Sequence, residues 1–222
     1  MIFKLSPSTL NLMEECPRCF WLSNHGKHRP SGIFPSLPNG MDKILKIHFD
    51  KFMARNELPP ELRKECADCK LFADKKLLEE WRNSRRGLWI EDKDGNILHG
   101  GIDNLLTRKG KLIVLDYKTR GYPLKDDTAE RSRLQLDVYN FLLRKLGYET
   151  EDFSFLLFYF PKEVLETGEV IFDTQLVKMK VDVENAEKIW KKAIKLLNEK
   201  CPKIHTEDSE EKCPWCELIA SE

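Results

Sequence analysis

The apolar residues of this 222-residue chain gather in dense runs that predict strands, and two of these runs meet at a tight turn. The runs cover residues 97–107 and 111–117, with Lys109-Gly110 between them. A glycine between two β-rich runs predicts a hairpin, because the tight turn needs positive φ. In both runs the odd and the even positions are apolar, so both faces of each strand are apolar. This is typical of strands covered on both faces.

The expected register of this hairpin brings three charged residues together. With Lys109-Gly110 as a two-residue loop, Asp103 lies directly opposite Asp116. Side chains alternate along a strand, so Asp116 and Lys118 share the face that Asp103 occupies. Two carboxylates about 5 Å apart in a partly dry site repel by on the order of several kcal/mol. A hard divalent cation such as Mg²⁺ would remove that repulsion. The alternative is an ordinary salt-bridged strand pair.

The remaining pattern alternates helical and extended segments. Helical periodicity is found in five segments: 6–22, 40–55, 57–86 (one or two helices), 127–146 and 183–199. Further strands are expected at 88–91, 153–160 (central) and 170–181 (edge). Ser6 or Ser8 is a plausible N-cap of the first helix, and Gly147 ends the fourth.

Composition and charge say less about the fold and the function than the sequence pattern does. The length suits one domain with small appendages. The formal net charge is zero, from 37 basic and 37 acidic residues, so any contact with nucleic acid must come from a local patch. With no run of 18 apolar residues and no signal-peptide pattern, we expect a soluble, cytoplasmic protein.

Two helices carry polar residues whose spacing suggests a role. His48 shares one stripe with Met41, Leu45 and Phe52, so it is expected to point inward. It would then be either a hydrogen-bonded core histidine or a metal ligand facing the two carboxylates. In the helix at 127–146 a polar stripe is formed at i, i+4 and i+8 by Arg131, Gln135 and Tyr139. A polar stripe is usually a solvated face.

The seven cysteines are odd in number and follow no secretory signal, which argues against a disulfide framework. The pairs Cys16-x-x-Cys19 and Cys213-x-x-Cys216 have the spacing of thiolate metal ligands. Zinc or an iron–sulfur cluster could therefore join the two chain ends; the alternative is a set of reduced, partly buried thiols. Cys66-Ala-Asp-Cys69 has no second pair nearby, and we expect two surface or half-buried thiols.

Four motifs in order resemble the PD-(D/E)XK nuclease superfamily, in particular its RecB-like branch. Gly101-Ile-Asp103 followed by Asp116-Tyr-Lys118 is similar to the G-x-D and D-x-K elements. Gly40–His48 is similar to the branch's helix with a glycine and a histidine, and Gln135–Tyr139 to its Q-x-x-x-Y element. Ile102 replaces the proline that precedes the first aspartate in the superfamily.

The resemblance assigns roles to residues. It implies these metal ligands: His48, Asp103, Asp116 and the backbone carbonyl of Tyr117. It further implies a water-activating lysine and two substrate-side residues: Lys118, Gln135 and Tyr139. The implied fold is α/β, with a restriction-endonuclease-like αβββαβ core at 40–200 whose mixed central sheet is flanked by helices. Residues 1–39 would be a helical N-terminal extension and 201–222 a tail, each with one C-x-x-C.

The implied function is a Mg²⁺- or Mn²⁺-dependent nuclease that hydrolyses phosphodiester bonds. DNA is the expected partner, in repair, recombination or defence against mobile elements. Arg120 and Arg131 lie close to the D-x-K element and could contact its phosphates, or belong to a solvated loop. The competing hypotheses are a catalytically silent nucleic-acid-binding or assembly module and a cysteine-based metal or redox protein. Cluster-bearing members of the branch usually have one N-terminal and three C-terminal cysteines, a pattern that these two pairs do not follow.

Overall fold

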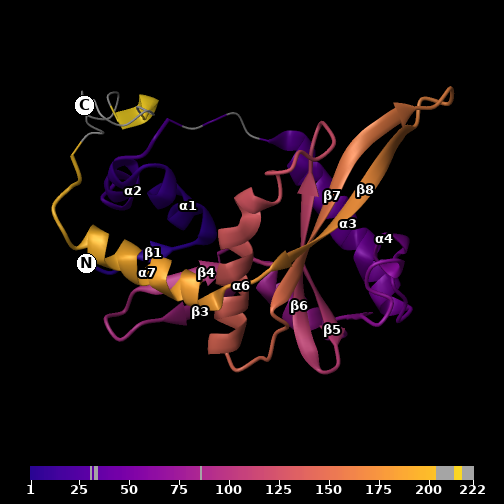
Figure 1. Cartoon of the computed structure of the whole chain (residues 1–222), viewed down its shortest axis with the longest axis horizontal. Helices are drawn as coiled ribbons and strands as arrows, with labels where there is room; N and C mark the ends of the chain where they lie inside the picture. Colours follow the sequence, from indigo (N-terminus) through magenta and orange to yellow (C-terminus); the bar gives the residue numbers. More distant parts are fainter. Residues whose placement is uncertain (31, 33–34, 86, 204–212, 217–222) are drawn as a thin grey trace.

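Two β-sheets lie side by side in the computed structural model, which describes residues 1–30, 32, 35–85, 87–203 and 213–216. The larger sheet has the order β2 (Lys70–Leu71), β5 (Asn104–Arg108), β6 (Lys111–Thr119), β7 (Phe153–Val164) and β8 (Val170–Lys180) (Figure 1). The smaller sheet has the order β1 (Lys4–Leu5), β4 (Ile97–Gly100) and β3 (Leu88–Glu91). In the larger sheet β6 and β7 are parallel and the other neighbours antiparallel, so this sheet is mixed.

The predicted central hairpin is confirmed in turn and register. Asn104 pairs with Leu115 and Arg108 with Lys111 across β5 and β6. The two turn residues of Lys109-Gly110 have φ of 48° and 83°, and a two-residue turn with both central residues at positive φ matches the strand twist. Extending this register by one residue places Asp103 opposite Asp116.

The prediction of one continuous strand over 97–107 is wrong. The chain leaves the small sheet at the end of β4 and enters the large sheet as β5. The chain crosses between the sheets directly after Gly100, where there is no room for a side chain. A Cβ on Gly100 would lie 2.6 Å from Cε1 of Tyr139. The crossing leaves Asp103 at the start of β5, at the edge of the covered part of the sheet.

The helices largely follow the predicted segments. Their bounds are α1 (Pro7–Glu15), α2 (Pro17–Asn24), α3 (Ser36–Ala54), α4 (Pro60–Arg63), α5 (Lys75–Trp81), α6 (Arg133–Lys145) and α7 (Val183–Leu197). The first predicted helix is divided at Cys16, because Pro17 begins a new helix there. The segment 57–86 forms two short helices with β2 between them. No helix among the described residues is both long and apolar enough to cross a membrane.

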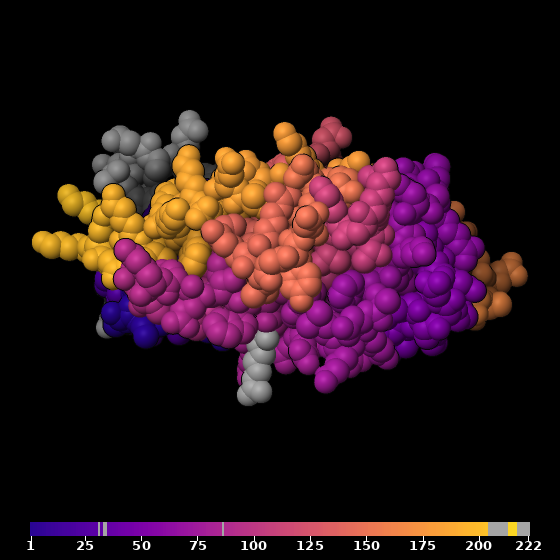
Figure 2. All heavy atoms as spheres, turned by 90° about the horizontal axis from the view of Figure 1, so that it is seen from below, coloured from indigo at the N-terminus to yellow at the C-terminus, as the bar shows by residue number. Residues whose placement is uncertain are grey.

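The larger sheet is covered on both faces, which confirms the predicted mixed sheet flanked by helices (Figure 1). One face packs against α1, α6 and α7 through alternating strand residues: Leu105, Val114, Leu156 and Phe158. The other face packs against α3 and α4 through the intervening residues: Leu106, Ile113, Leu115, Tyr117 and Leu157. In both views the chain's N-terminus and the end of α7 lie at the same end of the molecule (Figure 2).

Candidate active site

The facing carboxylates at the end of the central hairpin are the start of a polar network. Asp116 lies in β6 with only 2 % of its surface exposed. The ammonium nitrogen of Lys118, two residues further along the same strand face, is 2.6 Å from Asp116 Oδ2. The predicted convergence of these two side chains on one face is therefore present, and it lies on the side of the sheet that α6 covers.

Helix α6 adds the glutamine and tyrosine of the predicted polar stripe to this network. Gln135 Nε2 donates to Asp116 Oδ1 at 3.0 Å and to the Tyr139 hydroxyl at 2.8 Å. Lys118 Nζ donates to Gln135 Oε1 at 2.8 Å. One amide thus bridges the aspartate and the lysine, and it fixes the orientation of both. Gln135 and Tyr139 of the stripe face the sheet rather than solvent, since Tyr139 is buried, whereas Arg131 is exposed.

The second carboxylate, Asp103, is held by groups from three elements. Its Oδ2 accepts the backbone N–H of Tyr117 at 2.9 Å, and its Oδ1 is 3.1 Å from Lys46 Nζ of α3. Lys46 Nζ also lies 2.8 Å from the carboxylate of Asp42, one helical turn earlier. The backbone carbonyl of Asp103 accepts Arg82 Nε at 2.9 Å. Asp42 and Lys46 are site residues that sequence reasoning missed.

The electrostatics of this cluster favour an additional cation. Burial and the neighbouring Asp116 raise the pKa of Asp103 to about 7, although Lys46 opposes the shift. Burial would lower the pKa of Lys46, but Asp103 and Asp42 outweigh it and raise that pKa. Three carboxylates therefore face two ammonium groups, those of Lys46 and Lys118, and negative charge is in excess.

The donor atoms in this cluster suit a hard divalent cation. Asp103 and Asp116 offer carboxylate oxygens, and Asp42 of α3 adds a third acid that Lys46 links to Asp103. Among the described residues, the buried Asp116 Oδ2 accepts no hydrogen bond of good geometry, and its neighbour is the Lys118 ammonium. Magnesium and manganese prefer such oxygen ligands. The residues present therefore fit the metal that the sequence pattern implies.

His48 lies apart from the two carboxylates. Its Nε2 is 3.0 Å from Glu61 Oε1, and Glu61 also accepts the Tyr159 hydroxyl at 3.0 Å. The partly exposed imidazole packs edge-on against Phe49 and Phe52 of its own helix, on the side of the sheet that α3 covers. This is the opposite sheet face from the one on which Gln135 holds Asp116. The contacts of His48 are those of the core-histidine alternative.

The other predicted site residues, Tyr117, Arg120 and Arg131, differ in burial and in their contacts. The Tyr117 ring is buried against Phe49, and its hydroxyl accepts Asn104 Nδ2 at 2.7 Å, so only its backbone faces the carboxylates. Arg120 Nε is buried and has no hydrogen-bond partner among the described residues. Arg131 is exposed and pairs with Asp127 at 3.1 Å. Neither arginine touches the carboxylate cluster through a contact described above.

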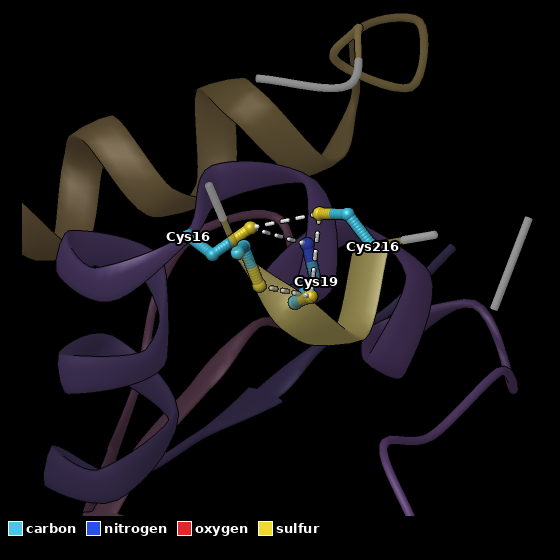
Figure 3. A group of neighbouring side chains, drawn as sticks. Cys16, Cys19 and Cys216 are labelled. Carbon is cyan, nitrogen blue, oxygen red and sulfur yellow. Dashed lines mark hydrogen bonds between the residues drawn. The ribbon is translucent and has the colours of Figure 1, made fainter. Parts of the chain in front are cut away.

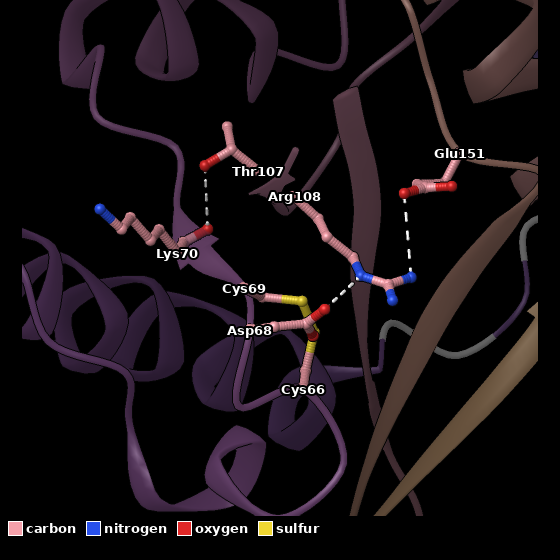
Figure 4. Close-up of a disulfide and its surroundings, with 7 residues drawn as sticks. All are labelled: Cys66, Asp68, Cys69, Lys70, Thr107, Arg108 and Glu151. Carbon is pink, nitrogen blue, oxygen red and sulfur yellow. Dashed lines mark hydrogen bonds and ion pairs between the residues drawn. A yellow bond between two sulfur atoms is a disulfide. The ribbon is translucent and has the colours of Figure 1, made fainter. Parts of the chain in front are cut away.

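The cysteines form two separate groups. The sulfur atoms of Cys16, Cys19, Cys213 and Cys216 all lie within 4.8 Å of one another, as the two-pair pattern predicts. The expectation of separate thiols at Cys66-Ala-Asp-Cys69 is wrong, because this pair is joined by a buried disulfide (Figure 4). The pair lies in a turn after α4 rather than in a helix, and a backbone hydrogen bond from 69 to 66 closes that turn.

Comparison with known proteins adds one match. A family model described as the PD-(D/E)XK nuclease superfamily matches residues 40–221 of this chain. The matched region contains the whole carboxylate network, α6 and the second cysteine pair. It begins after the first cysteine pair, Cys16 and Cys19. No curated protein matches the chain.

Proposed function

The chain belongs to the PD-(D/E)XK nuclease superfamily, and from that membership we propose that it is a Mg²⁺- or Mn²⁺-dependent nuclease of the RecB-like branch that cleaves DNA. The observation that carries the proposal is the bridge made by Gln135. It contacts both Asp116 and Lys118 and continues to Tyr139. The Q-x-x-x-Y element of that branch thus touches its D-x-K element in this chain.

The charge distribution supports an enzyme over a simple salt bridge. A salt-bridged strand pair would need one acid and one base, and Asp116 with Lys118 would complete it. Asp103 and Asp42 share the single ammonium of Lys46, which leaves one acid in excess, and burial of Asp103 beside another acid is unfavourable. Perturbed acids gathered in this way are typical of functional sites.

The proposed ligands for the metal are Asp103, Asp116 and the backbone carbonyl of Tyr117, with Asp42 as a fourth group. Asp42 replaces His48 in this set, because Lys46 links Asp42 to Asp103, whereas His48 Nε2 lies 3.0 Å from Glu61 Oε1. When bound, the ion would supply Lewis acidity toward the scissile phosphate and neutralise the excess negative charge.

Lys118 is the proposed general catalyst. Its ammonium is fixed between Asp116 Oδ2 and Gln135 Oε1, so a donor N–H is directed by two contacts that do not depend on substrate. From there it would orient the attacking water and stabilise charge that develops on the phosphoryl oxygens. Tyr139 secures the amide of Gln135 and so positions Lys118 indirectly.

Arg120 is the proposed contact to the substrate backbone. It follows Asp116 and Lys118 at two-residue spacing, and its N–H donates to the Tyr159 carbonyl at 2.9 Å, which continues the β6–β7 ladder. Its buried Nε has no partner among the described residues. A phosphate oxygen would satisfy that donor. With zero net charge, the chain depends on such local cations to bind DNA in repair, recombination or defence against mobile elements.

A cleavage assay tests the proposal. End-labelled single-stranded and double-stranded DNA, and RNA of the same sequence, would be incubated with the protein in Mg²⁺, Mn²⁺ or neither. Asp116→Asn and Lys118→Met should each reduce cleavage at least a hundredfold. Matched controls are Asp94→Asn and Lys93→Met, which make the same replacements in the exposed β3–β4 turn and should cleave normally.

The outcomes of this assay distinguish the proposed enzyme from its alternatives. Metal-dependent DNA cleavage that both site variants lose supports the enzyme as assigned. Cleavage that persists in both variants would show that the activity belongs to a contaminant or to another site. DNA binding without cleavage under any metal would favour the catalytically silent module. A preference for RNA would overturn the proposed substrate and leave the chemistry intact.

A further inference from the structure

We propose that Cys16, Cys19, Cys213 and Cys216 bind a single tetrahedral Zn²⁺ ion that joins the two ends of the chain. The four sulfur atoms come from segments almost the whole sequence apart and lie within 4.8 Å of one another. Figure 3 labels three of these residues, Cys16, Cys19 and Cys216, whose sulfur atoms point toward one another. The site is distinct from the carboxylate cluster, which lies in the larger sheet. It binds a metal through soft thiolates, where the carboxylate cluster offers only hard oxygens.

Local structure prepares each pair for ligation. Cys16 is the N-cap of α2, where Pro17 begins the helix, and the backbone N–H of Cys19 donates to Cys16 Sγ at 3.4 Å. The second pair spans one turn that the N–H of Cys216 closes onto the Cys213 carbonyl at 3.1 Å. Each pair thus presents two sulfurs from one tight turn, the arrangement found in structural zinc sites.

The sulfur–sulfur distances match one ion. Cys16 Sγ is 3.3 Å from Cys216 Sγ, and Cys19 Sγ is 3.5 Å from Cys213 Sγ and 3.7 Å from Cys216 Sγ. A tetrahedral site with Zn–S bonds of about 2.3 Å has sulfurs about 3.8 Å apart. In a [4Fe–4S] cluster each thiolate binds a different iron, so the core separates the thiolates further. The spacing therefore favours zinc over a cluster.

Burial and charge around the thiols support a bound cation. Cys16, Cys19 and Cys216 are buried and none of the four is in a disulfide. Four thiolates around Zn²⁺ carry two net negative charges, and Arg29 Nη2 lies 3.5 Å from Cys213 Sγ. Arg29 also pairs with Glu15 at 3.0 Å, so its guanidinium lies between a carboxylate and the sulfur cluster. There it would balance part of the negative charge of ionised sulfurs.

The consequence for the fold is a fixed C-terminus. After α7 the chain contacts α2 through its backbone carbonyls: Trp21 Nε1 donates to the Glu199 carbonyl at 3.0 Å, and Arg18 Nη1 donates to the Pro202 carbonyl at 2.8 Å. The zinc site would add a further attachment beyond residue 203, and it would close a loop that spans nearly the whole chain. Cross-links that close long loops restrict the unfolded state most strongly.

Metal analysis of the full chain tests the proposal. Protein purified without oxygen should contain about one zinc per chain, have no absorbance near 400 nm, and take up Co²⁺ with the visible bands of tetrahedral thiolate coordination. Cys213→Ser should lose the zinc. Cys201→Ser is the matched control, because Cys201 packs beside the cluster without belonging to the four, and it should keep the metal. Asp116→Asn, which changes only the carboxylate cluster, should also keep the zinc.

Other results would overturn the assignment. Brown protein with about four irons per chain would replace zinc by a cluster. Wild-type protein without metal that takes up no Co²⁺ would leave four reduced thiols. Loss of zinc in Asp116→Asn would locate the ion in the carboxylate cluster instead. If Cys213→Ser fails to fold, the zinc content and cobalt spectrum of the wild-type protein still decide between these outcomes.

Discussion

Replacing Asp103 with asparagine should stabilise the metal-free protein and abolish its activity. Asparagine resembles the neutral carboxyl in shape and keeps an acceptor for the Tyr117 N–H. The variant therefore removes the charge and little else. A stabilising loss of function is expected wherever a protein holds like charges together for a ligand that is absent.

The size of the effect follows from the pKa of Asp103. It rises from 3.8 to about 7, because of burial first and Asp116 second. At about 1.36 kcal/mol per pKa unit, ionising this group costs the native state up to about 4 kcal/mol. The amide of asparagine points a donor at Lys46 in some rotamers, so we expect a gain of about 1–3 kcal/mol at pH 8.

The stability difference between Asp103→Asn and the wild-type protein depends on pH. Between about pH 4 and pH 7 the native state of the wild-type protein binds the Asp103 proton more strongly than the unfolded state does, so stability falls as pH rises through this window. Below about pH 4 both states hold the proton, and wild type and variant should be equally stable with respect to this group. The Asp103→Asn advantage should therefore appear at pH 8 and vanish at pH 4.

Urea denaturation at the two pH values, in magnesium-free buffer, measures the effect. The matched control is Asp50→Asn, since Asp50 is equally exposed (19 % against 18 %) but pairs with Arg82 at 2.9 Å. Asp50→Asn should destabilise the protein at pH 8. Saturating Mg²⁺ should stabilise wild type and leave Asp103→Asn unchanged. If Asp103→Asn also destabilises at pH 8, the carboxylate pair is not strained and the metal-site argument fails.

Three further predictions follow from single contacts. Gln135→Leu should lower kcat/KM about tenfold to a hundredfold with little change in unfolding midpoint, because two charged partners each lose a hydrogen bond; steady-state cleavage kinetics measure this. Gly100→Ala should cost about 1–3 kcal/mol in urea denaturation and reduce cleavage, because its Cβ would meet the Tyr139 ring at 2.6 Å. Lys46→Met should lower the Mg²⁺ concentration for half-maximal thermal stabilisation, because the ammonium beside Asp103 no longer opposes the ion.

The hairpin register could be predicted because it depends on local chemistry alone. Lys109-Gly110 sets the turn, and the two-residue period then fixes which side chains share a face. The strand break before Asp103 could not be read in the same way. It arises from the approach of the Tyr139 ring to Gly100, a contact between residues that are distant in sequence.

The helix α3 shows the limit of periodicity. Its apolar stripe predicted that His48 points inward, and the partly exposed ring lies beside Glu61 of α4, 3.0 Å from its carboxylate. Periodicity alone does not say which part of the sheet each turn of the helix crosses. Only the placement of α3 shows that Asp42 and Lys46, near its start, reach the carboxylates at the strand end. The i, i+4 spacing of these two charges was the available signal, and on its own it indicates a surface ion pair.

The two proposed metal sites differ enough in chemistry to be separated by experiment. Oxygen donors at Asp103 and Asp116 select a hard ion that exchanges readily, whereas thiolates from Cys16 and Cys213 select zinc and release it slowly. Omitting Mg²⁺ should therefore stop catalysis and remove the stabilisation that the bound ion gives, while the chain ends stay attached. A strong zinc chelator should instead release the chain ends first and affect catalysis only through stability. Inactivation by EDTA alone would not tell these causes apart, and it is the pairing of magnesium omission with zinc analysis that assigns each metal to its site.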